Sequence, residues 1–161
     1  KKYLESYEKA WISMDKQVSE GGVIYIDQND CYWIEEYIVD PPTHILNGFI
    51  WSLWGVYDSW KIMGDDRGKD LFKKCIKTLV NNLKLYDNGY WSLYEQSNTL
   101  LPMLASPFYH KLHIVQLDVM HDITSLSIFK KYCDNWKKFE KTKKNRYKAL
   151  LGKSLFKIFY Y

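Results

Sequence analysis

The sequence predicts a mainly α fold, an incomplete (α/α) toroid of antiparallel helix pairs with small β-hairpins at one end. Apolar residues recur at spacings of three and four along several segments, which is the period of amphipathic helices. The turn "GDDRG" between the two central segments is short, so the helices it joins are expected to lie antiparallel. Asn-Gly, a signal of tight hairpin turns, follows the second of them. The length of 161 residues fits one domain, residues 1–161.

The N-terminal part predicts one helix and two short extended segments. Residues 1–19 carry apolar side chains at helical spacing, and "EGG" from Glu20 is the expected stop. The segments "VIYID" (residues 23–27) and "CYWIEEY" (residues 31–37) follow, joined by the turn-rich "QND". They either pair as a β-hairpin or cross the end of a helical bundle as extended loops.

Four further helices are predicted after the proline break in "DPPTH", because the residue before a proline is pushed out of helical geometry. Their expected ranges are about 43–63, 69–85, 109–121 and 125–141. Between the second and third of them, "YDNGYWSLYE" predicts a hairpin of two aromatic strands. An irregular segment leads from there to the third helix.

Composition narrows the classes of partner. Aromatic residues make up 17% of the chain, and Tyr and Trp serve both as core and as lining of carbohydrate sites. The net charge of +4 comes largely from lysines after Lys130, a region that reads as a solvated helix face and tail or as a surface for an acidic partner. No nucleic-acid-binding motif is present, so nucleic acid is not a predicted partner. An acidic polysaccharide remains a candidate.

No metal or cofactor is predicted. Cys31, Cys75 and Cys133 are widely separated and are expected to be buried free thiols. His110 and His113 lie one helical turn apart, without acidic or cysteine partners at metal-ligand spacing. This segment holds no predicted membrane span, and its opening "KKYLESYEKA" reads as part of a longer protein. Localisation therefore stays open.

The stretch "WIEEY" raises the main functional question. Glu35 and Glu36 form either a solvated acid pair above a core or one wall of a site for a polar ring. On the following helix, Trp51 and Trp54 cannot both face the core, so one of them is a candidate to stack on a sugar. Asn47 is expected to cap or brace that helix, with sugar contact as the alternative.

The order of several blocks resembles one known family. These are "GGVIYIDQNDCYWIEEY", "PPTHILNGFIWSLWGVYD", "LYDNGYWSLYE", "SPFYHKLHIVQLDVM" and "FKKYCDNWKKF". Together they are similar to the C-terminal helical domain of D-glucuronyl C5-epimerase, over about residues 21–139. The resemblance implies an (α/α) toroid with its active site on the concave face, in a cleft that preceding domains of the same chain complete.

The resemblance also implies a reaction and its residues. The family converts D-glucuronic to L-iduronic acid in heparan-sulfate-like polysaccharides, by removing and returning a proton alpha to the carboxylate. Its glutamate and two tyrosines fall on Glu36, Tyr94 and Tyr109. Glu36 and Tyr94 are assigned to the proton-handling pair, and Tyr109 to the second face or to a tight substrate contact. The expected substrate-binding residues are Trp33, Asn47, Trp51, His110 and His113.

This chain departs from the family pattern after the first tyrosine. Ser97 stands at the arginine position and Asn98 at the histidine position, while Val115 replaces an asparagine. An arginine there would clamp a sugar carboxylate, and Lys111 and Arg67 are the candidates to replace it. The departure keeps two alternatives open: an inactive homologue that binds a polysaccharide, and a helical interaction domain.

Overall fold

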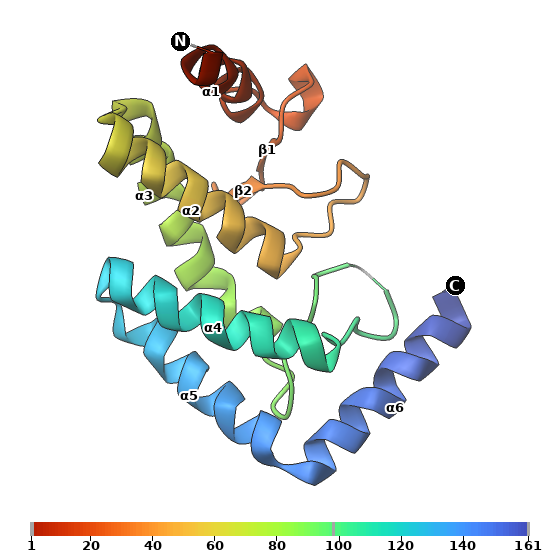
Figure 1. The fold of residues 1–161 in the computed structure, drawn as a ribbon. Coiled ribbons are helices and arrows are strands. Elements are labelled where there is room, and N and C mark those ends of the chain that lie inside the picture. The colour runs from red at the N-terminus through yellow and green to blue at the C-terminus, as the bar shows by residue number, and fades with distance from the viewer. Residues whose placement is uncertain (1, 98, 161) are drawn as a thin grey trace.

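A computed structural model describes residues 2–97 and 99–160, and the described part is mainly helical with one small antiparallel sheet (Figure 1). Its helices and strands are α1 (Lys2–Met14), β1 (Ile24–Ile26), β2 (Tyr32–Ile34), α2 (Leu46–Met63), α3 (Asp66–Asn82), α4 (Pro107–Thr124), α5 (Ser127–Lys141) and α6 (Lys143–Tyr160), with short 3-10 turns at Val18–Glu20 and Leu83–Tyr86. None of the described helices is both long and apolar enough to cross a membrane.

The first helix is shorter than predicted, and the hairpin after it is confirmed. α1 ends at Met14 rather than near residue 19, because the chain turns to bring the Lys16 carbonyl against the amide of Ile24, at 3.1 Å. Glycine is required at position 22, since a Cβ there would overlap the Lys16 backbone. β1 then pairs antiparallel with β2, with Tyr25 opposite Trp33. The alternative of unpaired extended loops is therefore wrong.

Two antiparallel helix pairs, α2–α3 and α4–α5, form the body of the fold, as Figure 1 shows. α2 begins at Leu46, later than the predicted start near residue 43, and its first amide donates to the Tyr94 carbonyl at 3.1 Å. Gly68 lets α3 approach α2 closely, because a Cβ there would overlap Ser59 and the α2 backbone. The pairing of helices is thus as predicted, whereas the toroidal arrangement remains a prediction.

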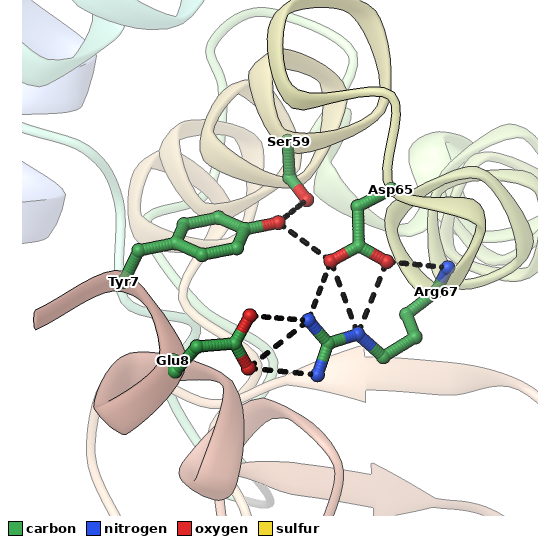
Figure 2. A network of polar contacts seen from close by, with 5 residues as sticks. All are labelled: Tyr7, Glu8, Ser59, Asp65 and Arg67. Carbon is green, nitrogen blue, oxygen red and sulfur yellow. Dashed lines mark hydrogen bonds and ion pairs between the residues drawn. The ribbon is translucent and has the colours of Figure 1, made fainter. Parts of the chain in front are cut away.

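A polar network fixes α1 to the turn between α2 and α3 (Figure 2). The Arg67 guanidinium donates to both Glu8 and Asp65, with its shortest contact of 2.6 Å to Asp65. The Tyr7 hydroxyl lies 2.5 Å from the Ser59 hydroxyl and donates to Asp65 at 2.7 Å. Hydrogen bonds from Arg67 are the main reason that the pKa of Asp65 falls to about 2. Arg67 therefore has a structural task at this corner.

The segment after α3 makes a tight turn but not the predicted pair of aromatic strands. A single bridge joins Asp87 and Ser92 around the Asn-Gly turn, and the Leu93 amide still donates to the Tyr86 carbonyl at 2.8 Å, but the other edge of Leu93 pairs with Leu104. The prediction of strands is wrong because the chain leaves the turn to pair with the segment before α4. The Trp91 ring is fully buried there, and its Nε1 donates to the Ala105 carbonyl at 2.9 Å.

The C-terminal segment forms α6, a helix where the sequence suggested a solvated tail. α6 turns back from the end of α5 toward the loop that precedes α4 (Figure 1). Ala149 joins Trp91 and Leu104 in a second, small apolar cluster, and Gly152 lets α6 approach Leu104. The larger core lies between the two helix pairs and the sheet. Its fully buried members include Trp33, Phe49, Leu53, Leu79, Phe129 and Trp136.

Candidate functional site

A groove of about 520 Å³ lies where the segment after β2, the loop before α4, the start of α4 and α6 meet. Aromatic, acidic and basic side chains face one another across it, which is the composition expected of a site for a charged sugar. The members of the lining that carry rings or charges are Tyr37, Tyr94, Glu95, Tyr109, Lys153 and Lys157.

The structure brings the two predicted tyrosines together in this groove. The rings of Tyr94 and Tyr109 meet edge to face, with centroids 4.8 Å apart. Backbone pairing positions Tyr94, because its amide donates to the Met103 carbonyl at 2.8 Å. Tyr109 lies in the first turn of α4, where its amide donates to the capping hydroxyl of Ser106 at 3.3 Å. Residues 15 positions apart in sequence thus share one wall.

A bend after β2 separates the two glutamates of "WIEEY". Glu35 points inward and is 6% exposed, where it pairs with the His44 ring and accepts from the His44 amide at 3.2 Å. The alternative of two solvated acids is therefore wrong for Glu35. Glu36 lies in a bend beyond the end of β2 and is exposed overall. Its side chain packs over Gly48, in the first turn of α2.

Glu36 acts electrostatically on Tyr94. Although Glu36 is exposed overall, partial burial of its carboxyl raises its pKa, which moves it toward the range where a general acid or base works best. The pKa of Tyr94 is also raised, first by burial, then by the negative charge of Glu36 and by Tyr109. A phenol with a raised pKa is protonated at neutral pH, so in the free protein Tyr94 holds a proton and is a poor base, although the same shift makes it a weaker acid. Without substrate, Tyr94 is therefore suited to the role of acid and Glu36 to that of base.

The two predicted histidines lie in the core rather than on the groove. His110 and His113 are fully buried, and the Ser92 hydroxyl lies between their Nδ1 atoms, at 2.8 and 3.0 Å. The His110 ring also stacks on Trp91, with centroids 3.7 Å apart. Burial lowers the pKa of His110 to about 4 and that of His113 to about 3. They hold the loop that carries Tyr94 against α4, and their burial leaves no surface for a substrate.

The remaining predicted binding residues also lie away from the groove lining. Trp33 is 2% exposed and stacks on His44, with centroids 4.1 Å apart. Asn47 is equally buried at the start of α2, and its backbone carbonyl accepts a hydrogen bond from the Gln116 side chain at 3.0 Å. Trp51 is exposed on α2 but does not line the groove. For Trp33 and Asn47 the geometry favours a structural role, and sugar stacking by Trp51 stays a prediction.

The cationic side chains that line the groove come from α6, a helix that the sequence pattern did not connect with the site. Lys153 of α6 donates to the Leu104 carbonyl at 3.0 Å, and its Nζ lies 5.7 Å from the centre of the Tyr94 ring. Neither earlier candidate is in the lining: Lys111 is exposed elsewhere on α4, and Arg67 is bound to Glu8 and Asp65. A helical period in the lysine-rich tail was the sequence signal that could have revealed Lys153 and Lys157 as lining residues.

Two further residues complete the account of the expected site. Ser97, at the family's arginine position, has its hydroxyl 3.1 Å from that of Thr99. Asn98 lies outside the residues that the structure describes. Within residues 2–97 and 99–160, no group of His, Cys, Asp or Glu side chains is arranged to hold a metal ion.

The fold and the groove define a mainly helical domain with two phenols in one groove and a carboxylate, Glu36, whose charge acts on Tyr94. The chain belongs to the D-glucuronyl C5-epimerase family: residues 1–138 match the family described as "D-glucuronyl C5-epimerase C-terminus". It is similar to D-glucuronyl C5-epimerase of Caenorhabditis elegans, at 30% identity over 153 residues. It is also similar to an uncharacterised protein of Methanocaldococcus jannaschii, at 28% identity over 139 residues.

The chain spans only part of these relatives. Each match covers 84% of this chain, but 24% of the nematode protein and 44% of the archaeal protein. The family match ends before α6, which begins at Lys143. Family membership therefore extends over the segments that carry Glu36, Tyr94 and Tyr109, and not over the helix that carries Lys153.

Proposed function

We propose that this domain belongs to a uronyl C5-epimerase that converts D-glucuronic to L-iduronic acid residues within an acidic, heparan-sulfate-like polysaccharide. The observation that carries the proposal is the contact of Tyr94 with Tyr109 in one groove, with Glu36, outside the lining, close enough for its charge to raise the pKa of Tyr94, in a chain of the C5-epimerase family. A non-catalytic interaction domain would not need a carboxylate and two phenols to lie close together. The preceding domains of a longer chain would complete the cleft.

The reaction needs a base on one face of the sugar ring and an acid on the other. A base takes the C5 hydrogen as a proton, and the electron pair of the C–H bond delocalises into the adjacent carboxylate to give an enolate-like intermediate. A proton from the opposite face then forms the new C5–H bond. Glu36 and Tyr94 are the proposed proton-handling pair, with Tyr109 as the second acid or base or as a tight substrate contact. No electron is lost or gained, so none of these steps requires a redox partner.

One observation favours a second candidate, a homologue that binds the polysaccharide without turnover. Ser97 stands where the family resemblance places an arginine, and a bidentate arginine is a strong ligand for a carboxylate. A serine hydroxyl supplies no charge. On this hypothesis the groove would still bind acidic sugar, while the C5 proton would stay in place.

Exchange of the C5 hydrogen with deuterium in heavy water, followed by NMR, distinguishes the two candidates. We expect the full chain to exchange this hydrogen in a glucuronate-containing polysaccharide. Glu36→Gln and Tyr109→Phe should each lower the exchange rate by about a hundredfold or more, as removal of a general acid or base does. Glu5→Gln and Tyr3→Phe, exposed on α1, are the matched controls. Binding without exchange on any such polymer would leave the silent homologue as the function.

A further inference from the structure

Helix α6 contributes a basic wall to the groove from outside the part of the chain that matches the family. Lys153 and Lys157 are separated by one helical turn, so both project from the same face of α6. That face lies against the loop before α4, as the contacts of Gly152 and Lys153 with Leu104 show. Two cationic side chains thus line the same groove as Tyr109, and that of Lys153 lies beside the Tyr94 ring.

The positions of these lysines leave them free to bind an anion. Lys153 is half-buried, and the one hydrogen bond that fixes it, to the Leu104 carbonyl, leaves further N–H groups for a ligand. Lys157 is exposed at the mouth of the groove. Among the described residues neither lysine takes part in an ion pair, although the Glu95 carboxylate lines the same groove. Burial and the neighbouring Lys157 lower the pKa of Lys153.

We propose that Lys153 and Lys157 bind the uronate carboxylates of an acidic polysaccharide, and that Lys153 supplies at Tyr94 the cation that this chain lacks at Ser97. The inference rests on the proposed function, because it names the substrate contact of the same groove. A half-buried ammonium binds a carboxylate more strongly than a surface lysine does, since less water screens the pair. The same charge stabilises the extra negative charge that the sugar carboxylate gains when C5 loses its proton.

Binding of a defined polymer tests the inference separately from turnover. The probe is an unsulfated polymer of alternating glucuronic acid and N-acetylglucosamine, and its carboxyl-reduced form is the uncharged comparison. We expect Lys153→Met in the full chain to weaken binding of the acidic polymer about tenfold or more, the usual effect of losing a charged hydrogen bond. Lys157→Met should weaken it by roughly twofold to fivefold, because that lysine is more exposed. Neither variant should change binding of the reduced polymer.

Two controls exclude trivial causes. Lys144→Met removes the same charge from an exposed position at the start of α6 and should leave affinity unchanged. Lys153→Arg keeps the charge and should retain most of the binding, and circular dichroism establishes that each variant is folded.

The outcomes separate the two proposals. If Lys153→Met weakens binding but the wild-type chain exchanges no C5 hydrogen, the lysine site stands and the epimerase proposal falls. If exchange occurs while Lys153→Met binds like Lys144→Met, the lysine site is overturned and the epimerase stands. A wild-type chain that does not bind the acidic polymer more tightly than the reduced one overturns the lysine site as well.

Discussion

At the scale of single residues, the contact between Glu36 and Gly48 decides where the carboxylate stands. The Glu36 side chain occupies the space that a Cβ at position 48 would fill, with its Cβ and its carboxyl group both in overlap. No small shift of the carboxylate tip resolves this, since the clash extends to the base of the side chain. Gly48 therefore positions Glu36, and the glycine of the "LNGF" block has a physical reason.

Gly48→Ala is expected to displace Glu36 and to lower the C5 exchange rate by about tenfold to a hundredfold, because misplacement by about 1 Å costs that much in a pre-organised site. KM should change less than kcat, since the groove and its lysines are untouched. Stability should fall by about 1–3 kcal/mol, because the added Cβ overpacks a buried position and better helix propensity offsets only part of that cost.

The same helix offers the control for this prediction. A Cβ at Gly55 meets no neighbouring atom, so Gly55→Ala should leave exchange unchanged and stabilise α2 by about 0.5–1 kcal/mol. Kinetics and chemical denaturation on both variants check the pair. Equal exchange rates for Gly48→Ala and the wild type would remove the positioning role of Gly48.

At the scale of elements, α4 carries both a groove residue and a buried imidazole pair. Tyr109 faces the groove, while the next residue, His110, and His113 face the core and share the Ser92 hydroxyl. Protonating either ring would place a charge in an apolar environment beside the loop of Tyr94. The position of the tyrosine pair therefore depends on the histidines remaining neutral.

We expect the free energy of unfolding to fall as the pH drops from about 6.5, the unfolded histidine pKa, toward 4 and below. Both histidines have lowered folded pKa values, about 4 and about 3, so the unfolded chain binds protons first and gains stability relative to the fold. The loss should amount to a few kcal/mol on this order-of-magnitude argument. Asp65, with a pKa of about 2, adds its own loss only below its ordinary value of 3.8.

Denaturant unfolding at a series of pH values measures this slope. His113→Gln should flatten the curve between pH 6.5 and 4 while lowering stability at neutral pH. His121→Gln, at the end of α4 with its ring bonded to the Leu126 carbonyl, should leave the slope unchanged. A wild-type curve that is flat over this range would contradict the neutral buried pair.

The helices and strands also show which parts of the fold the local sequence pattern could predict. The β1–β2 hairpin and helices α2 to α5 were predictable within a few residues, because each has a strong apolar period and a clear turn or proline at its boundary. The prediction of two aromatic strands around Asn88 was wrong, since Leu93 pairs with Leu104 and no local sequence signal encodes that partner. The early end of α1 likewise depends on a contact between Lys16 and Ile24.

The site was predictable where family resemblance covers it and unpredictable elsewhere. Glu36, Tyr94 and Tyr109 could be chosen from matching blocks, although their catalytic roles stay predictions. The burial of His110 and His113 could not be foreseen from their spacing, because the groups packed against them, Ser92, Trp91 and Trp136, are distant in the sequence. Lysines from α6 were missed since no resemblance covers that segment.

At the scale of the whole molecule, α6 joins the fold through a narrow contact. The groove needs α6 for its basic wall, yet the buried residues of this helix are Ala149 and Phe156. By comparison, α4 buries both histidines, Gln116 and several apolar side chains against α2 and α5. Large apolar side chains on the outer face of α6, such as Leu151 and Ile158, remain exposed. A helix held by few buried contacts opens at a lower free energy than the core.

We therefore expect amide hydrogen exchange in residues 143–160 to be much faster than in α4, and to slow when the groove is filled. An acidic polysaccharide at about a hundred times its Kd, bound only to the closed form, should protect α6 by about a hundredfold if its binding requires α6 to be docked. Lys153→Met should lose most of that protection at the same polymer concentration. In contrast, α1, which contributes no residue to the groove lining, should exchange alike with and without polymer. Mass spectrometry of peptic fragments measures all three segments in one experiment. Slow exchange of α6 in the free chain, or polymer protection that spares α6, would show that this helix is not the mobile wall of the groove.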